Sequence, residues 1–363
     1  MSFSRKLLRA FSFQSVRLSA VALILTAASA RADDLFLSQN ARTFDTQQSS
    51  LITKGLGNAC LAVAGIPDSL PCNSGMLPLY DRPKLGVQAL ISNGYSTLDK
   101  IRKLLNGNLN QDTVNALFGK DHILQIEGNA EIDFISKYFS ARYTPETVRY
   151  FSVIRNEANP EVEISAVEEK NFVVQGAYPV NDLLTLGLQA KSYSRRFVKE
   201  RFQLIDLATD AGKNALKPKT QHGIFFEPTA TLNLPGSLKP RLVLAVANVG
   251  SEDGDVDRLN EPAEVQAGGA VTVPIGWADV QMDLDYKSLS YNESWNQKFH
   301  LGGVLRFGTM WLSGGLDYYG MSGGVFYGLE QVNAGILFTS TQVPWNSNDY
   351  YANTVYLQIG WQI

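Results

Sequence analysis

The sequence lacks a run of about 18 apolar residues, the least that a membrane-spanning helix needs. Charged residues make up only 18%, against ~25% in soluble domains. With 3 His and 2 Cys, metal sites and histidine-based catalysis have few candidate residues. The chain is acidic overall (net charge -3) and its basic residues cluster only at the start, which argues against a nucleic-acid partner. A hydrophobic content of 45% excludes intrinsic disorder.

Residues 1–32 have the pattern of a secretory signal peptide. A basic stretch with Arg5, Lys6 and Arg9 precedes a short apolar stretch, LSAVALILTAA, which small residues follow. Cleavage is expected after Ala30 or after Ala32. About 11 apolar residues are too few for a membrane anchor, which needs ~20. We therefore expect export, and an exported chain without spanning helices is either soluble or a closed β-barrel.

Residues 33–83 show no sustained periodicity and contain Cys60 and Cys72. In an oxidising compartment this pair favours a disulfide. A metal site is the weaker interpretation, because no His lies nearby. Residues 95–120 then show helical spacing, with Leu98, Ile101 and Leu104 on one face, and a second helical turn is expected near 114–118.

From residue 84 onward, apart from that helical stretch, alternation of apolar and polar residues dominates. In the last segment Val355, Leu357, Ile359, Trp361 and Ile363 alternate with polar residues or Gly. Such runs last nine residues or more, the length of a tilted membrane strand. Phe299 and Phe307 bracket one apolar face about 26 Å apart, as interfacial aromatic girdles do. Short and long connections alternate, with short turns expected on the periplasmic side.

These features predict an all-β fold: a transmembrane antiparallel β-barrel formed by residues 84–363. The segments yield about 14 strands, with about 12 as the alternative. The strand within 123–143 loses its alternation near Ser136, which indicates a bulge or an extra turn there. Both ends should lie in the periplasm and the 95–120 helices outside the cell. Polar residues that alternate with the lipid-facing apolar ones should then line the lumen. These candidates are Asp279, Gln281, Asp283, Asp285, Lys287, His300 and Arg306.

Catalytic and metal motifs are weak in this sequence. His122, His222 and His300 have no metal-ligand spacing, and no Gly-x-Ser-x-Gly motif occurs. The segment SEDGDVD (251–257) offers oxygen donors but not the spacing of a calcium loop, so a solvated acidic outer loop is expected. We expect no enzyme activity, no cofactor and no metal.

The segment GLGNACLAVAGIPDSLPCNSGML resembles the N-terminal signature of the long-chain fatty-acid transporter superfamily of outer-membrane barrels. The nearest resemblance is to conjugal-transfer TraF-like outer-membrane proteins, which RLVLAVANVG (241–250) and YPVNDLLTLGLQ (178–189) also resemble. In this sequence, Ser74 and Gly75 stand where that family has Pro and Ala. The comparable positions of the signature are Gly55, Gly57, Asn58, Ala59, Ala64, Asp68 and Asn73.

The resemblance implies that residues 33–83 fold into the lumen as a plug and that hydrophobic solutes diffuse past it. A passive channel for small hydrophobic or amphipathic molecules is therefore our first hypothesis. The alternatives are a structural or assembly-linked outer-membrane protein without transport and, less favoured, a barrel-borne lipid hydrolase. In each case the expected partners are outer-membrane lipid and the barrel-assembly machinery, for which the last strand is the insertion signal.

Overall fold

The computed structural model describes residues 50–65, 70–80, 82–108, 110–118, 123–155, 160–255, 263–288, 294–329, 331–345 and 348–363. The expected signal peptide lies outside these residues, as do Asp68, His122 and Asp257. Within the described part, no helix is long and apolar enough to cross a membrane.

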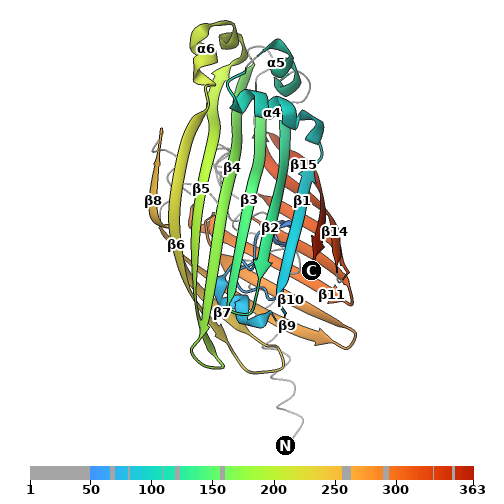
Figure 1. Ribbon diagram of the computed structural model, residues 1–363. Coiled ribbons are helices and arrows are strands. Elements are labelled where there is room, and N and C mark those ends of the chain that lie inside the picture. Colours follow the sequence, from blue (N-terminus) through green and yellow to red (C-terminus); the bar gives the residue numbers. More distant parts are fainter. Residues whose placement is uncertain are drawn as a thin grey trace, which may run out of the picture.

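Antiparallel strands form most of the described chain (Figure 1). Their bounds are β1 Lys84–Ser92, β2 Ile123–Ile135, β3 Phe139–Arg155, β4 Glu161–Pro179, β5 Leu184–Gln203, β6 Lys219–Asn233, β7 Arg241–Ala247, β8 Val249–Gly254, β9 Glu264–Ile275, β10 Ala278–Tyr286, β11 Phe299–Phe307, β12 Met310–Asp317, β13 Gly320–Gly328, β14 Val332–Trp345 and β15 Asn348–Gln362.

The sheet closes on itself into a barrel. Strands β1 to β6 and β9 to β15 pair in sequence order, β7 pairs with β6 and β9, and β1 pairs with β15 to close the sheet. Strands β7 and β8 both pair with β6 and are one strand interrupted at Asn248, whose φ is 56°. The barrel wall therefore has 14 strands, which confirms the expected number. Beyond Asn248, β8 continues along β6.

One strand boundary differs from the sequence-based expectation. Residues 123–143 do not form one strand: β2 ends at Ile135 and β3 begins at Phe139. Ser136 makes the tight turn, since its N–H and hydroxyl both donate to the Phe139 carbonyl. Alternation is lost near Ser136 because the chain reverses there. Strand β3 then runs through Pro145 with a bulge between Thr144 and Thr147.

The outer face is apolar at the positions that alternation assigns to lipid. On β15, Leu357 and Ile359 are 51% and 64% exposed. Tyr356, which points to the other face of the strand, is 2% exposed. Aromatic clusters bracket this band on β9–β11: Trp277 contacts Phe307 at one end, and Phe299 contacts Tyr286 and Trp295 at the other. An apolar outer face between two aromatic girdles is the surface of a transmembrane barrel.

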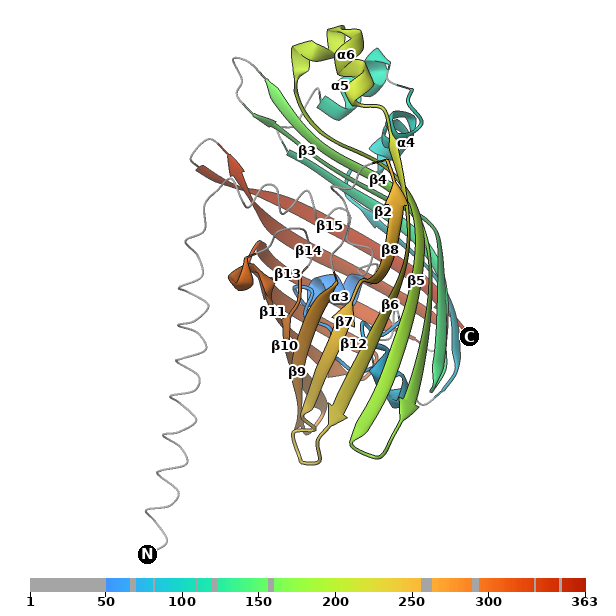
Figure 2. The same ribbon diagram turned by 90° about the vertical axis from the view of Figure 1, so that its left-hand side faces the viewer.

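The two sides of the barrel differ in height. Strands β3, β4 and β5 have 17, 19 and 20 residues, whereas β11, β12 and β13 have nine, eight and nine. We call the end where β1 starts and β15 finishes the near end, and the opposite end the far end. The longer strands rise past their neighbours at the far end (Figures 1 and 2).

Short helices cover the outer surface of these tall strands at the far end (Figure 1). They are η2 Tyr95–Thr97, α4 Leu98–Leu105, α5 Gln111–Phe118, η3 Leu204–Ala208 and α6 Asp210–Ala215; η5 Trp295–Lys298 lies apart, before β11. We call α4, α5 and η3 the outer cap. Ile101 and Leu104 of α4 are buried against Ile164 of β4 and Val198 of β5. These two strand residues point outward, as the exposed Phe172 and Leu186 on the same strands do, so α4 packs on the outside of the wall.

The outer cap is also tied to the strands by ion pairs. Arg102 of α4 makes two 2.8 Å hydrogen bonds to Glu146, and these bonds raise the pKa of Arg102. Arg196 of β5 donates hydrogen bonds to Asn106, directly after α4, and to Glu168 of β4. The expected helices are thus present, and they seal an apolar strand surface that extends beyond the lipid-facing band.

Candidate functional site

Residues 50–65 and 70–80, which we call the inner segment, lie within the barrel (Figure 2). They include α3 Leu51–Gly55 and η1 Ser74–Leu79. Leu51, Ile52 and Leu56 are fully buried and pack against Trp311 and Leu337 of the wall. The segment therefore occupies the lumen instead of lying outside the barrel.

Inward polar residues of β10 hold the inner segment by its backbone. Asp285 accepts hydrogen bonds from the N–H groups of Cys60 and Leu61, at 2.7 and 2.9 Å. Asp283 accepts from Ala62 N–H at 3.4 Å. Residues 60–62 thus run along β10 with their N–H groups directed at consecutive inward carboxylates. Hydrogen bonds to a charged acceptor are the stronger kind, so this is a firm attachment.

The next inward residue along β10 extends this attachment. Gln281 both accepts from Ala64 N–H and donates to the Ala64 carbonyl, at 3.2 and 3.1 Å. Arg241 of β7 donates to the Ala62 carbonyl at 2.8 Å and also to Gln281. Leu61 and Ala62 pack against Val243 and Ala270. Val243 of β7 and Ala270 of β9 therefore give the inner segment an apolar contact with the wall.

Lys287 and His300 continue the contact with the inner segment toward the far end. The Lys287 ammonium lies 3.8 Å from Asp285 and 3.3 Å from the Cys60 sulfur. The two ring nitrogens of His300 lie 3.2 Å from the Gly57 carbonyl oxygen and 3.1 Å from that of Lys287. Both side chains are buried, so neither lines an open path.

The remaining two lumen-lining candidates, Asp279 and Arg306, lie at the near-end rim of the barrel. They are opposite each other in the β10–β11 ladder, and both are exposed. The Arg306 guanidinium stacks over the Trp311 ring at 4.9 Å. The structure thus separates the seven candidates into a buried group that binds the inner segment and an exposed pair at the rim.

The Gly and Asn positions of the N-terminal signature are explained by close approach and turn geometry. Gly57 has φ +61°, and a Cβ there would lie 2.5 Å from the Leu316 backbone nitrogen. A Cβ at Gly55 would meet Ser313 at 2.2 Å. Asn58, with φ 69°, donates to Asp317 at 3.1 Å. Asn73 caps η1 by accepting from Gly75 N–H and also donates to Thr231 on the wall.

Cys60 and Cys72 form a disulfide, as the sequence predicted, with their Cα atoms 5.8 Å apart. The bond joins the stretch that lies on β10 to the start of η1, which packs against β4, β5 and β6. It therefore ties together two parts of the inner segment that contact different parts of the barrel wall.

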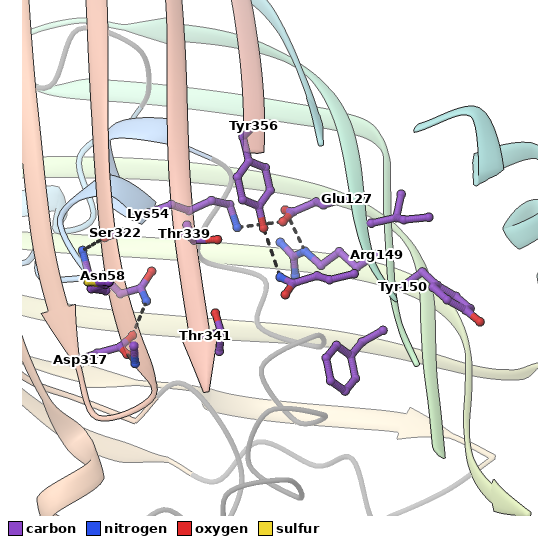
Figure 3. Close-up of a pocket in the computed structure, with 16 residues that line it drawn as sticks. Lys54, Asn58, Glu127, Arg149, Tyr150, Asp317, Ser322, Thr339, Thr341 and Tyr356 are labelled. Carbon is purple, nitrogen blue, oxygen red and sulfur yellow. Dashed lines mark hydrogen bonds and ion pairs between the residues drawn. The ribbon is translucent and has the colours of Figure 1, made fainter. Parts of the chain in front are cut away.

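A cavity of about 130 Å³ lies between α3 and the inner face of β2 and β3 (Figure 3). Glu127 of β2 accepts from Lys54 of α3 at 3.0 Å and from Arg149 of β3 at 3.3 Å. The Tyr356 ring lies beneath the Lys54 ammonium, 5.6 Å from it. These side chains converge in Figure 3, whereas Tyr150 points away.

The other side of this cavity comes from β12–β14 and the turn after α3. Asp317 accepts from Asn58 through Oδ2, and its Oδ1 accepts from the N–H groups of Tyr319 and Gly320 at 2.9 Å. Ser322 accepts from Gly57 N–H at 3.1 Å. Sequence reasoning missed this site because its residues come from six separate strands, a helix and the turn after it. The only signal was the inward parity of Glu127 and Arg149.

The acidic segment 251–257 is not a fully solvated loop. Glu252 belongs to β8, and its carboxylate lies 3.6 Å from Arg195 and accepts from the Tyr193 hydroxyl. Arg195 also lies 4.0 Å from Glu169. Asp255 is exposed, as expected. The Thr220 N–H and hydroxyl donate hydrogen bonds to its carboxylate, and these bonds lower the pKa of Asp255. The expectation is thus wrong for Glu252, because β8 continues the wall and turns this side chain inward.

The described residues contain no group of three or more His, Cys, Asp or Glu that could hold a metal ion. His222 is exposed on the outward parity of β6, opposite Ser194. The cavity beside α3 combines ion pairs with aromatic surface.

Comparisons with known proteins find a shared architecture and little sequence identity. The sequence matches no model of a known protein family and no curated protein. A deltaS2S3 mutant of the monoaromatic hydrocarbon channel TodX matches the structure with a TM-score of 0.50 and 8% identity, over 86% of this chain and 98% of that one.

Two further solved structures give slightly lower scores. The toluene transporter TbuX of Ralstonia pickettii has a TM-score of 0.48 and 12% identity, over 88% of this chain and 99% of its own. The monoaromatic hydrocarbon channel CymD has a TM-score of 0.49 and 10% identity, over 86% and 96%. The chain thus has a 14-stranded transmembrane β-barrel fold of the kind seen in the TodX mutant.

Proposed function

We propose that the protein is a passive channel of the Gram-negative outer membrane for small hydrophobic or amphipathic solutes. The inner segment acts as its plug, the near end faces the periplasm and the far end faces the outside. The expected signal peptide, the apolar outer face and the short near-end turns support this placement. The barrel-assembly machinery and outer-membrane lipid are its proposed partners.

The observation that carries the proposal is the cavity of about 130 Å³ inside a closed barrel. It lies beside an inner segment that the opposite wall holds through Asp283 and Asp285. A plug fixed to β10 leaves the side toward β2 and β3 for solute, and the cavity is on that side. A cavity of this volume suits a molecule of about one ring, since a cavity of about 150 Å³ holds one benzene.

Fold likeness supports the same solute class. The TodX mutant is described as a monoaromatic hydrocarbon channel, and its barrel matches this chain over most of both lengths. We propose that this protein also conducts small aromatic solutes. The resemblance of the N-terminal signature to the long-chain fatty-acid transporter superfamily points to a lumen plug and hydrophobic solutes as well. The closer resemblance to conjugal-transfer TraF-like proteins stays a prediction.

The test is initial uptake of radiolabelled toluene by Gram-negative cells that express the protein, compared with cells that carry an empty vector. The full chain should raise uptake, and deletion of residues 50–80 should raise it further if the barrel still assembles. Heat-modifiable migration on gels and equal membrane levels serve as controls for assembly. If neither assembled form raises uptake, the channel proposal is wrong and a structural role replaces it.

A further inference from the structure

The two halves of the Cys60–Cys72 disulfide differ in how far they are covered. Cys60 is 1% exposed, whereas Cys72 is partly exposed and lines a cavity of about 20 Å³. A cavity of this volume has room for about one water-sized group. A small group can therefore approach Cys72, while the rest of the protein covers Cys60.

The charges around the two cysteines differ as well. The charged side chains that line the Cys72 cavity are Arg142 and Lys191, each with a glutamate partner, and its described lining contains no carboxylate. Cys60 instead lies beside the buried carboxylate of Asp285, which accepts a hydrogen bond from the Cys60 N–H. A disulfide is attacked by a thiolate, which is an anion. An attacking thiolate therefore meets cations at Cys72 and a carboxylate at Cys60.

The wall also favours Cys60 as the sulfur that leaves. The ammonium of Lys287 lies 3.3 Å from the Cys60 sulfur, closer than the 3.8 Å that separates it from Asp285. The Cys72 sulfur has the neutral hydroxyl of Thr53 at 3.7 Å. An adjacent ammonium stabilises a thiolate, and the sulfur that forms the more stable thiolate leaves faster in thiol–disulfide exchange.

We propose that Cys72 is a modification site, at which a small thiol forms a mixed disulfide while Cys60 leaves as a thiolate beside Lys287. The thiol first gives its proton to solvent, and its sulfur then attacks the Cys72 sulfur. A new S–S bond forms between these two atoms, the Cys60–Cys72 bond breaks, and the electron pair of that bond passes to the Cys60 sulfur. One disulfide replaces another, so the step needs no further oxidant or reductant.

This modification opens the loop between Cys60 and Cys72 while both ends of the loop keep their contacts with the wall. The N–H groups of Cys60 and Leu61 still donate to Asp285, and Asn73 still donates to Thr231 at 2.8 Å. The barrel should therefore stay assembled after modification. The chemistry does not depend on solute passage, so its failure would leave the channel proposal standing.

The experiment treats the purified full-length protein with 2-mercaptoethanol, stops the reaction with acid, and locates the adduct by peptic digestion and mass spectrometry. In the folded protein the adduct on Cys72 should exceed that on Cys60 about tenfold or more, whereas protein unfolded in guanidinium should carry similar amounts on both. Glutathione, which is bulkier, should react with the folded protein about tenfold more slowly at equal thiolate concentration, because the cavity is small.

Variants at Lys287 test the leaving group separately from access. Lys287→Met should slow the initial exchange about tenfold, and Lys287→Arg, which keeps a cation, should restore most of the rate. Lys103→Met, at an exposed position of α4, is the matched control and should react like the unmodified protein.

Equal adducts on the two cysteines of the folded protein, or an excess on Cys60, would overturn the inference. An unchanged rate in an assembled Lys287→Met would overturn the assignment of Cys60 as the leaving sulfur. If Lys287→Met does not assemble, the adduct ratio in the folded unmodified protein and the comparison with glutathione still decide.

Discussion

The backbone N–H of Cys60 donates a 2.7 Å hydrogen bond to Asp285, which lies 225 residues further along the chain. This contact joins the inner segment to the middle of the barrel wall. Asp285 is fully buried and also lies 3.8 Å from the Lys287 ammonium. A buried carboxylate is costly unless it is paired and hydrogen-bonded, and here the inner segment supplies two of its donors.

Asp285→Asn should loosen the inner segment without opening the barrel. The substitution removes the charge that accepts from Cys60 and Leu61, and such hydrogen bonds contribute ~1.5–3 kcal/mol each. Hydrogen exchange at these two N–H groups should become faster by about tenfold or more. Asp279→Asn, at the exposed near-end rim, is the control. Unchanged protection in Asp285→Asn would contradict the assigned attachment.

Removing the disulfide should affect the inner segment locally. The closed loop is short, so the chain-entropy model assigns it about 3 kcal/mol. In Cys60→Ser/Cys72→Ser, residues 60–72 should become sensitive to added protease, while the barrel keeps its heat-modifiable migration. Loss of barrel assembly in this variant would show that the disulfide acts on the whole fold.

Met282→Arg should impair assembly because Met282 faces lipid at the middle of β10. It is 51% exposed on the same parity as Leu284. A cation on the lipid face of a barrel costs ~2–4 kcal/mol at the midplane. The yield of heat-modifiable protein should fall, and Met282→Leu, which keeps the volume and the apolar character, should not lower it. Similar yields for both variants would argue against the assigned outward parity.

Deleting residues 354–363 should prevent a stable barrel. Strand β15 pairs with both β14 and β1, so its loss leaves two open edges in lipid, where backbone groups find no hydrogen-bond partner. The truncated chain should not reach the outer membrane in heat-modifiable form. Ile363→Ala, which keeps the strand, should assemble; a correctly inserted truncation would refute the closure of the barrel through β15.

Leu104→Ala should destabilise the outer cap and leave transport unchanged. Leu104 is fully buried in the cluster that joins α4 to the tall strands, and such truncations cost ~2–5 kcal/mol. Hydrogen exchange should become faster in α4 and α5, whereas toluene uptake should equal that of the unmodified protein. Lys103→Ala, on the neighbouring exposed position, is the control. A drop in uptake would mean that the cap contributes to the solute path.

Much of the wall was predictable from local alternation. The apolar parity of β10, β11 and β15 follows from the sequence, because one face must meet lipid and successive side chains point to opposite faces. The Cys60–Cys72 pair followed from export to an oxidising compartment, and the helix around Ile101 from its helical spacing. The β2–β3 turn could not be distinguished from a bulge, because Ser136-Lys137-Tyr138 contains no Gly or Pro that marks a tight turn.

The sequence by itself therefore determined which side chains face lipid and which face inward, since that choice depends on neighbours one and two positions away. Only the tertiary structure decided what the inward residues do. Asp283 and Asp285 bind the inner segment instead of lining an open path, and Glu127 meets Lys54 and Arg149 around a cavity. These contacts join positions tens to hundreds of residues apart, and no local pattern encodes which of them the closed barrel brings together.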